Sequence, residues 1–189
     1  STILDAATGG ESDKPAKASV AAYRELLEKI WVLDPVPAWT PALTPLRRLT
    51  VGEKHQLCDP GLAAHLLGLT EEKLTSGASG SGEMFGQLFE SLATLSVRAA
   101  AVPAEATVHH LRTRGGRQEV DLVVERFDGA VIGIEVKLAR RIRDSHVQHL
   151  HWLGEQIGER MVDKVVLYAG DTAGRRSDGV AVVPLAMFF

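Results

Sequence analysis

The sequence contains a single cysteine, Cys58, in 189 residues. One cysteine excludes a disulfide framework within the chain and any zinc site built from several cysteines. Long hydrophobic runs are also missing: none approaches the ~20 residues that a membrane-spanning helix needs, and no charged and then apolar signal sequence opens the chain. We therefore expect a cytoplasmic protein with no membrane association.

An excess of positive charge is absent as well. The chain has 21 Lys and Arg against 24 Asp and Glu, a formal net charge of -3, so contact with nucleic acid must come from a local patch. Aromatic residues make up 5%, hydrophobic residues 45% and charged residues 24% of the chain, which excludes a mainly disordered, collagenous or coiled-coil protein. The length suits one domain with a small appendage. The first residue is Ser rather than Met, which is typical of a processed or excised piece.

The N-terminal third predicts one helix and an extended arm. Apolar residues with i, i+3, i+4 and i+7 spacing predict a helix over residues 19–33. Four prolines then break it and predict an arm that ends near Arg48: Pro35, Pro37, Pro41 and Pro45. Two interpretations stay open, a part of a winged-helix unit or an arm that packs on the main domain.

The rest of the chain predicts an α/β domain. Asp59 and Pro60 are suited to begin a short helix and Gly68 to end it, while the glycine-rich residues 76–82 lack the lysine of a nucleotide-binding loop and predict a linker. The expected order is then helix, three antiparallel strands, helix, strand, strand, over residues 83–100, 106–113, 119–126, 130–138, 142–161, 164–169 and 180–184.

The register of the predicted hairpin decides where its acidic residues lie. Side chains alternate faces along a strand, so Glu135 and Lys137 share one face. A two-residue loop would turn Asp121 away from Glu135, whereas a three-residue loop over residues 127–129 places the two opposite each other. The hydrophobic pattern favours the longer loop, and Gly129 suits its last position. That register gathers one apolar face by pairing Val120 with Val136, Leu122 with Ile134 and Val124 with Ile132.

Two carboxylates and an ammonium group on one patch suit metal-dependent chemistry. Carboxylates at contact distance repel, and a divalent cation between them relieves the repulsion. Mg²⁺ (or Mn²⁺) bound by Asp121 and Glu135 would polarise a phosphate oxygen and acidify a water, and Lys137 would stabilise negative charge. Glu90 adds a third carboxylate if its helix packs beside the strands. The plainer interpretation is an ion-pair cluster at the surface.

Residues 112–143 contain eight Lys or Arg and five Asp or Glu, a local excess of three positive charges. Such a patch either follows a phosphate backbone beside the metal site or is an ordinary solvated face. Arg112 either contacts phosphate or pairs with Glu119. The candidate nucleic-acid-binding residues are Arg112, Arg114, Arg117, Arg140, Arg141 and Arg143.

The pattern of Asp121 and then Glu135-Val136-Lys137 on a hairpin, after a helical Glu90, resembles the PD-(D/E)XK nuclease superfamily. Over residues 54–137 the sequence more closely resembles the uncharacterised C-terminal nuclease-like domain of bacterial and archaeal AAA-type ATPases. The matching landmarks are Cys58-Asp59-Pro60-Gly61-Leu62-Ala63, Gly86-Gln-Leu-Phe-Glu90, Leu111-Arg112-Thr113, Glu119-Val-Asp121 and Ile134-Glu-Val-Lys137. Tyr23-Arg-Glu-Leu-Leu27 and the arm through Trp39 resemble the winged-helix segment that precedes this domain.

This resemblance implies a restriction-endonuclease-like αβββαβ core over residues 51–189, after a winged-helix-like segment over residues 1–50. It implies a Mg²⁺ site at Asp121 and Glu135 with Glu90 nearby, and Lys137 as the catalytic lysine. It also implies an AAA-type ATPase core, in the same full-length chain or as a partner. Val120 stands where the superfamily often has proline.

The expected function is Mg²⁺-dependent phosphodiester hydrolysis of DNA. The alternative is a catalytically inactive module that binds nucleic acid or protein for the ATPase, and a third interpretation is a dimerisation domain. The sequence leaves the choice of DNA or RNA, the strand preference and the oligomeric state open.

Overall fold

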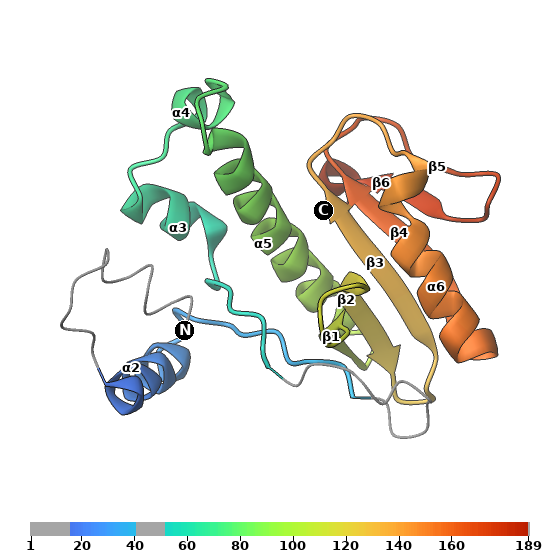
Figure 1. Cartoon of the computed structure of the whole chain (residues 1–189), viewed down its shortest axis with the longest axis horizontal. Coiled ribbons are helices and arrows are strands. Elements are labelled where there is room, and N and C mark those ends of the chain that lie inside the picture. Colours follow the sequence, from blue (N-terminus) through green and yellow to red (C-terminus); the bar gives the residue numbers. More distant parts are fainter. Residues whose placement is uncertain (1–15, 41–51, 189) are drawn as a thin grey trace.

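The computed structural model describes residues 16–40 and 52–188, in which a mixed six-stranded sheet is flanked by helices (Figure 1). The α/β class is confirmed, and the predicted order of helix, three strands, helix and two strands is found with one additional strand, β5, between the last two. The elements are α2 (Lys17–Lys29), α3 (Pro60–Leu66), α4 (Glu71–Thr75), α5 (Ser81–Ala101), β1 (Ala106–Arg112), β2 (Glu119–Arg126), β3 (Val131–Lys137), α6 (Gln148–Ile157), β4 (Met161–Tyr168), β5 (Gly174–Arg175) and β6 (Ala181–Pro184).

The sheet has the order β1-β2-β3-β4-β6-β5. The first three strands form the predicted antiparallel meander, while β4 pairs with β3, and β6 with β4, in parallel. A parallel neighbour needs a crossover, and α6 provides it between β3 and β4. The two-residue strand β5 was not predicted, because a pair of residues has no periodicity.

Helices α5 and α6 cover opposite faces of the sheet, and Figure 1 shows them on either side of β3. Because side chains alternate along a strand, neighbouring residues of β2 enter different cores. Leu122 packs on the α5 side with Val97, while Val123 packs on the α6 side with Leu150. All four side chains are buried.

The segment before the sheet follows its local signals closely. The Asp59 carboxylate accepts hydrogen bonds from the backbone N–H groups of Gly61 (2.7 Å) and Leu62 (3.2 Å), so it caps α3 as predicted. Gly68 follows the helix with φ +60°, a conformation that glycine adopts without strain. The predicted linker over residues 76–82 is shorter, because α5 begins at Ser81, and the short helix α4 precedes it.

The arm packs on the main domain. Val36 and Trp39 are buried, and backbone hydrogen bonds join Trp39 N–H to His110 C=O (2.7 Å) and His110 N–H to Pro37 C=O (2.9 Å). The Trp39 indole N–H also donates to the Glu125 carboxylate at 2.8 Å. The described arm therefore fits the packing interpretation. Pro41, Pro45 and the predicted end near Arg48 lie outside the described residues, and a winged-helix unit stays a prediction.

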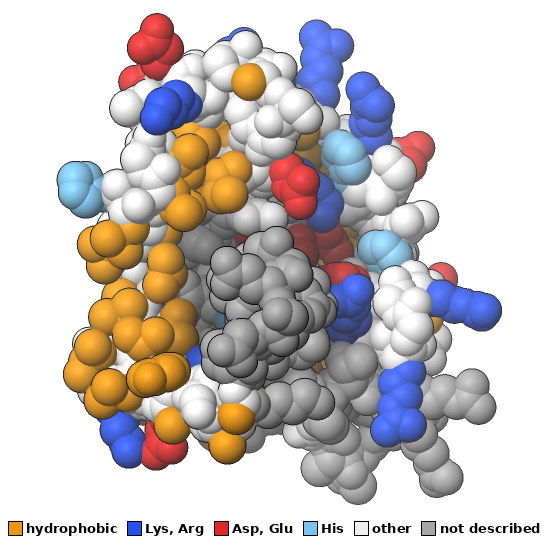
Figure 2. Space-filling view, turned by 60° about the vertical axis from the view of Figure 1, so that its left-hand side comes forward, with side chains coloured by type: hydrophobic (Ala, Val, Ile, Leu, Met, Phe, Trp, Pro, Cys, Tyr) orange, Lys and Arg blue, Asp and Glu red, His pale blue; other side chains and the backbone are white. Residues whose placement is uncertain are grey.

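The predicted apolar face of the first helix is exposed rather than packed. Tyr23, Leu26 and Ile30 are more than half exposed, as are Leu66 at the end of α3 and Leu67 after it. The side of the molecule that carries α2, α3 and α4 shows many hydrophobic side chains (Figure 2). No helix within the two described stretches is long and apolar enough to cross a membrane.

The prediction of one long helix over residues 142–161 is wrong. A short 3-10 turn, Asp144–His146, precedes α6, and a second, Gly158–Arg160, follows it. Gly158 has φ +57° and ends the helix, and Met161 already begins β4. The apolar spacing of Leu150, Leu153 and Ile157 was real, but Ile142 and Met161 reach the same core from outside the helix.

Candidate functional site

The hairpin β2–β3 has the predicted three-residue loop. Leu122 pairs with Ile134 and Val124 with Ile132, and Gly129 has φ +83° at the last loop position. The ladder ends at Leu122 and Ile134, one residue before the acidic pair. One part of the prediction was wrong: Val120 packs on the α6 side, because the register of β1 against β2 shifts between His109 and Leu111.

The end of this ladder holds the predicted cluster of Asp121, Glu135 and Lys137. Asp121 Oδ2 accepts a hydrogen bond from the Val136 backbone N–H at 2.9 Å. Beyond the end of the ladder, a side chain rather than the β2 backbone therefore pairs with this N–H group. Lys137 Nζ lies 2.5 Å from Glu135 Oε2 and 3.4 Å from Asp121 Oδ2. The ammonium group thus bridges the two carboxylates from β2 and β3.

Burial and charge separate the two carboxylates of the pair. Glu135 is 3% exposed, and burial together with the charge of Asp121 raises its pKa to about 8. The positive charge of Lys137 lowers this pKa but does not outweigh the other two effects. Burial also opposes ionisation of Asp121, but Lys137, Lys54 and the Val136 N–H lower its pKa overall. At neutral pH the pair therefore holds one proton, mainly on Glu135.

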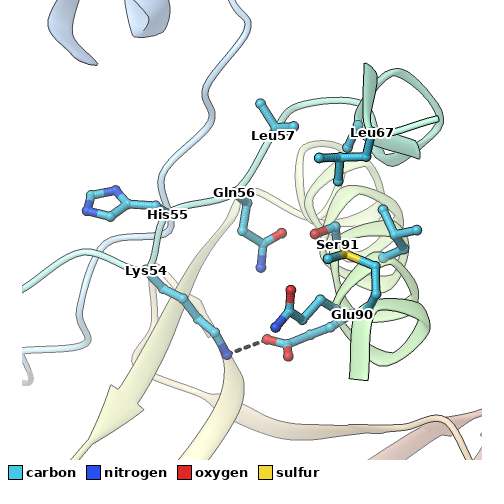
Figure 3. A pocket seen from close by; sticks show the side chains of 11 residues that line it. Lys54, His55, Gln56, Leu57, Leu67, Glu90 and Ser91 are labelled. Carbon is cyan, nitrogen blue, oxygen red and sulfur yellow. Dashed lines mark ion pairs between the residues drawn. The ribbon is translucent and has the colours of Figure 1, made fainter. Parts of the chain in front are cut away.

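Glu90 comes to the cluster from α5, but a lysine stands between it and the acidic pair. Lys54 Nζ forms an ion pair with Glu90 Oε1 and lies 3.7 Å from Asp121 Oδ1 and 4.0 Å from Glu119 Oε1. Figure 3 shows the Lys54 and Glu90 side chains pointing toward each other across a pocket. Burial lowers the pKa of Lys54, but Asp121, Glu90 and Glu119 raise it overall, so its ammonium group stays charged.

The residues at the cluster fit a hard divalent cation in their chemistry. Their donors are carboxylate oxygens, and Glu135 Oε1 is buried with no hydrogen-bond partner among the described residues. The positions are nevertheless not those of a formed metal centre. Within residues 16–40 and 52–188, no three histidine, cysteine or acidic side chains are gathered to hold a metal ion. Lys54 and Lys137 provide the countercharge instead.

The predicted arginines come from two stretches of the chain, the end of β1 with the turn after it and the segment after β3. Arg112 Nε is 3.5 Å from Glu119 Oε2, which agrees with the pairing interpretation, and Arg114 and Arg117 are exposed in the β1–β2 turn. Arg140 and Arg141 follow β3 in the chain, and Arg143 is exposed after them.

Three hollows border Lys54, its acidic partners or the predicted arginines. One of about 270 Å³ contains Lys54 and Glu90 (Figure 3), and one of about 470 Å³ contains Lys54, Arg112 and Glu119. A polar hollow of about 400 Å³ is lined by Arg140 and Arg141. Lys54 therefore borders two open spaces.

Sequence reasoning missed Lys54 and assigned Glu119 only as a partner for Arg112. Lys54 lies in an extended segment whose backbone pairs with Val36, and Lys54 and Gln56 turn toward the pocket while His55 points away (Figure 3). Alternation along this segment was the available signal, but two residues give too short a pattern to identify a face.

Two family models match the chain. The first, described as a domain of unknown function (DUF4143), matches residues 85–188, and the second, also a domain of unknown function (DUF8612), matches residues 8–73. Comparison with curated proteins and with solved structures found no match. The first match contains Glu90, Asp121, Glu135 and Lys137, whereas Lys54 falls in the second. Because the first match covers more than half of the 189 residues, the chain belongs to the DUF4143 family.

Proposed function

We propose that the cluster is the active site of a metal-dependent phosphodiesterase that acts on DNA. The observation that carries this proposal is the convergence of Asp121, Glu135 and Lys137 where β2 and β3 separate, with Glu135 Oε1 buried and unpartnered. A buried carboxylate oxygen without a hydrogen-bond partner is costly in a purely structural role. The resemblance to the PD-(D/E)XK nucleases and their restriction-endonuclease-like core supports the same proposal.

In this proposal Asp121 and Glu135 hold Mg²⁺ or Mn²⁺, with Glu90 as a further oxygen donor. A bound divalent cation would supply positive charge to a phosphate oxygen and acidify a coordinated water. Metal binding requires Glu135 to lose its proton, so the site favours the metal as the pH approaches 8.

Lys137 acts in this proposal as a fixed cation rather than as a base. Burial lowers the pKa of its ammonium group, but Asp121 and Glu135 raise it overall, so the group is protonated at neutral pH. A protonated lysine orients the attacking water and stabilises the charge that develops on phosphate. It does not abstract a proton.

The predicted arginines extend the proposal to a polyanionic substrate. Arg112 borders the hollow that contains Lys54 and Glu119, and Arg140 and Arg141 border another, so both hollows offer cations to a phosphate backbone. The resemblance further suggests that the domain works with an AAA-type ATPase core.

The position of Lys54 supports a second candidate function. Its ammonium group lies between Glu90 and Asp121, where it neutralises carboxylates without a metal. A module of this kind would bind DNA or a protein partner of the ATPase and would not cleave. Salt-dependent DNA binding without hydrolysis would favour this candidate.

The test is a cleavage assay on supercoiled, linear, nicked and single-stranded DNA with Mg²⁺, Mn²⁺ or EDTA. Glu135→Gln and Lys137→Met remove the acid and the cation at the site, and Glu155→Gln changes an exposed acid of α6 as the matched control. We expect metal-dependent cleavage that falls at least about 100-fold in both site variants and persists in the control.

Cleavage that is equal in all four proteins would reveal a contaminating nuclease, and no cleavage by the wild type on any substrate would contradict the proposed activity.

A further inference from the structure

We propose that Lys54 is the resident cation of the carboxylate cluster, and that a divalent metal ion binds by displacing its ammonium group. Lys54 then determines how tightly the site holds the metal. This inference rests on the proposed metal-dependent function and adds a residue from outside the DUF4143 match.

The backbone of Lys54 is fixed, while its side chain is the movable part. Lys54 N–H donates to Val36 C=O at 2.9 Å, and Val36 N–H donates to Lys54 C=O at 2.8 Å. Val36 is fully buried, so this pair of hydrogen bonds anchors the segment to the core. The four-carbon stem of the lysine remains free to rotate within that anchor.

The ammonium group stands where the acidic residues converge. It pairs with Glu90 and lies 3.7 Å from Asp121 and 4.0 Å from Glu119, so one positive charge faces three carboxylates. A divalent cation on Asp121 would lie within a few ångströms of this ammonium group and repel it strongly. The metal and Lys54 therefore compete for the same oxygens.

The structure offers room for the displaced side chain. Lys54 borders the pocket of about 270 Å³ that contains Glu90 and the hollow of about 470 Å³ that contains Arg112. Rotation of the stem moves the charge into open space without any change of the backbone. The Glu90 carboxylate and Asp121 Oδ1 then lose the lysine that faces them, while Asp121 Oδ2 keeps its bond from the Val136 N–H.

A fixed structural ion pair would have the opposite consequence. If Lys54 only positions Glu90 and Asp121, its removal lets the two carboxylates move apart and weakens metal binding. If Lys54 competes with the metal, its removal strengthens metal binding. The sign of the change separates the two roles.

The test is a calorimetric titration with Mn²⁺ of the full chain and of Lys54→Met. Lys29→Met is the matched control, because it removes the same charge from an exposed pair with Glu25. We expect Lys54→Met to bind Mn²⁺ about tenfold tighter than the wild type, since coupling between neighbouring sites is commonly 5- to 150-fold. Lys29→Met keeps the wild-type affinity, and adding Glu135→Gln to Lys54→Met abolishes the gain.

A second readout follows the lysine itself. Acetic anhydride labels free amines, and peptide mass spectrometry measures the modified fraction at each lysine. We expect Mn²⁺ to increase the labelling of Lys54 several-fold and to leave that of Lys29 unchanged.

The outcomes distinguish this inference from the proposed function. The competition is overturned if Lys54→Met binds Mn²⁺ equally well or more weakly than the wild type, or if bound Mn²⁺ does not change the labelling of Lys54. Either result is compatible with the proposed metal site. Binding by Lys54→Met alone also overturns the inference, because the metal then does not displace the ammonium group of the wild type. Absence of binding in both proteins overturns the inference and the metal site together.

Discussion

Glu135→Gln should remove a large part of the pH dependence of folding stability. The pKa of Glu135 is raised from 4.5 to about 8, mainly by burial and then by the charge of Asp121. Below pH 4.5 the folded and unfolded chains both hold the proton. Between pH 4.5 and 8 the unfolded chain releases it and the folded chain keeps it, so stability falls as the pH rises through this window.

The size of the effect follows from the shift. One pKa unit corresponds to about 1.4 kcal/mol, so a rise from 4.5 to about 8 gives at most about 5 kcal/mol. Entry of water and relaxation around a buried charge reduce this, and we expect about 2 to 3 kcal/mol. Gln is neutral at every pH and similar in shape, so the variant lacks this loss.

The assay is urea denaturation of the wild type, Glu135→Gln and the exposed control Glu155→Gln from pH 5 to pH 9, in EDTA. Glu135→Gln should be close to the wild type at pH 5 and gain about 2 to 3 kcal/mol on it by pH 9. The low pKa of Asp121 acts only in more acidic solution and does not enter this range. Parallel stability curves for the wild type and Glu135→Gln would refute the reasoning.

Three further predictions concern the arm, the sheet and the site. Trp39→Ala should lower the free energy of unfolding by about 3 to 5 kcal/mol, because the ring is buried and its N–H donates a hydrogen bond to Glu125. Trp39→Phe keeps a buried ring and loses only that hydrogen bond, so it should cost only about 1 kcal/mol. Urea denaturation measures both. Gly133→Ala should destabilise the chain by about 1 kcal/mol. Its Cβ would lie 3.1 Å from Cδ2 of the fully buried Leu150, although Met161 Cε at 2.8 Å can move aside; an unchanged thermal midpoint would contradict this. Mn²⁺ binding at pH 6.5 should release about one proton, mainly from Glu135, and calorimetry in buffers of different ionisation enthalpy counts it.

The hairpin shows what the sequence determines well. The alternation of apolar residues allowed only the three-residue loop, and the pairing of Leu122 with Ile134 confirms it. Asp121 and Glu135 therefore meet as predicted, because the parity of a strand is a local property. The cap at Asp59 was equally local and equally predictable.

Features that depend on distant contacts were not predictable in this way. Lys54 reaches the cluster because its segment pairs with Val36, eighteen positions earlier in the chain. No local sequence pattern predicts that pairing. Val120 turns to the other core because β2 has one extra residue opposite β1, between the pairs His109–Val123 and Leu111–Val120. The long helix was overpredicted because Ile142 and Met161 enter the same core as α6 from flanking turns and strand.

The most direct test of the metal site is calorimetric titration of the wild type with Mn²⁺ at pH 8, beside Asp121→Asn and Glu135→Gln. It needs no choice of nucleic-acid substrate, and it examines the two carboxylates on which the account depends. We predict one Mn²⁺ per chain in the wild type and no binding in either variant. A wild-type chain that takes up no Mn²⁺, or variants that bind as well as the wild type, would contradict the account.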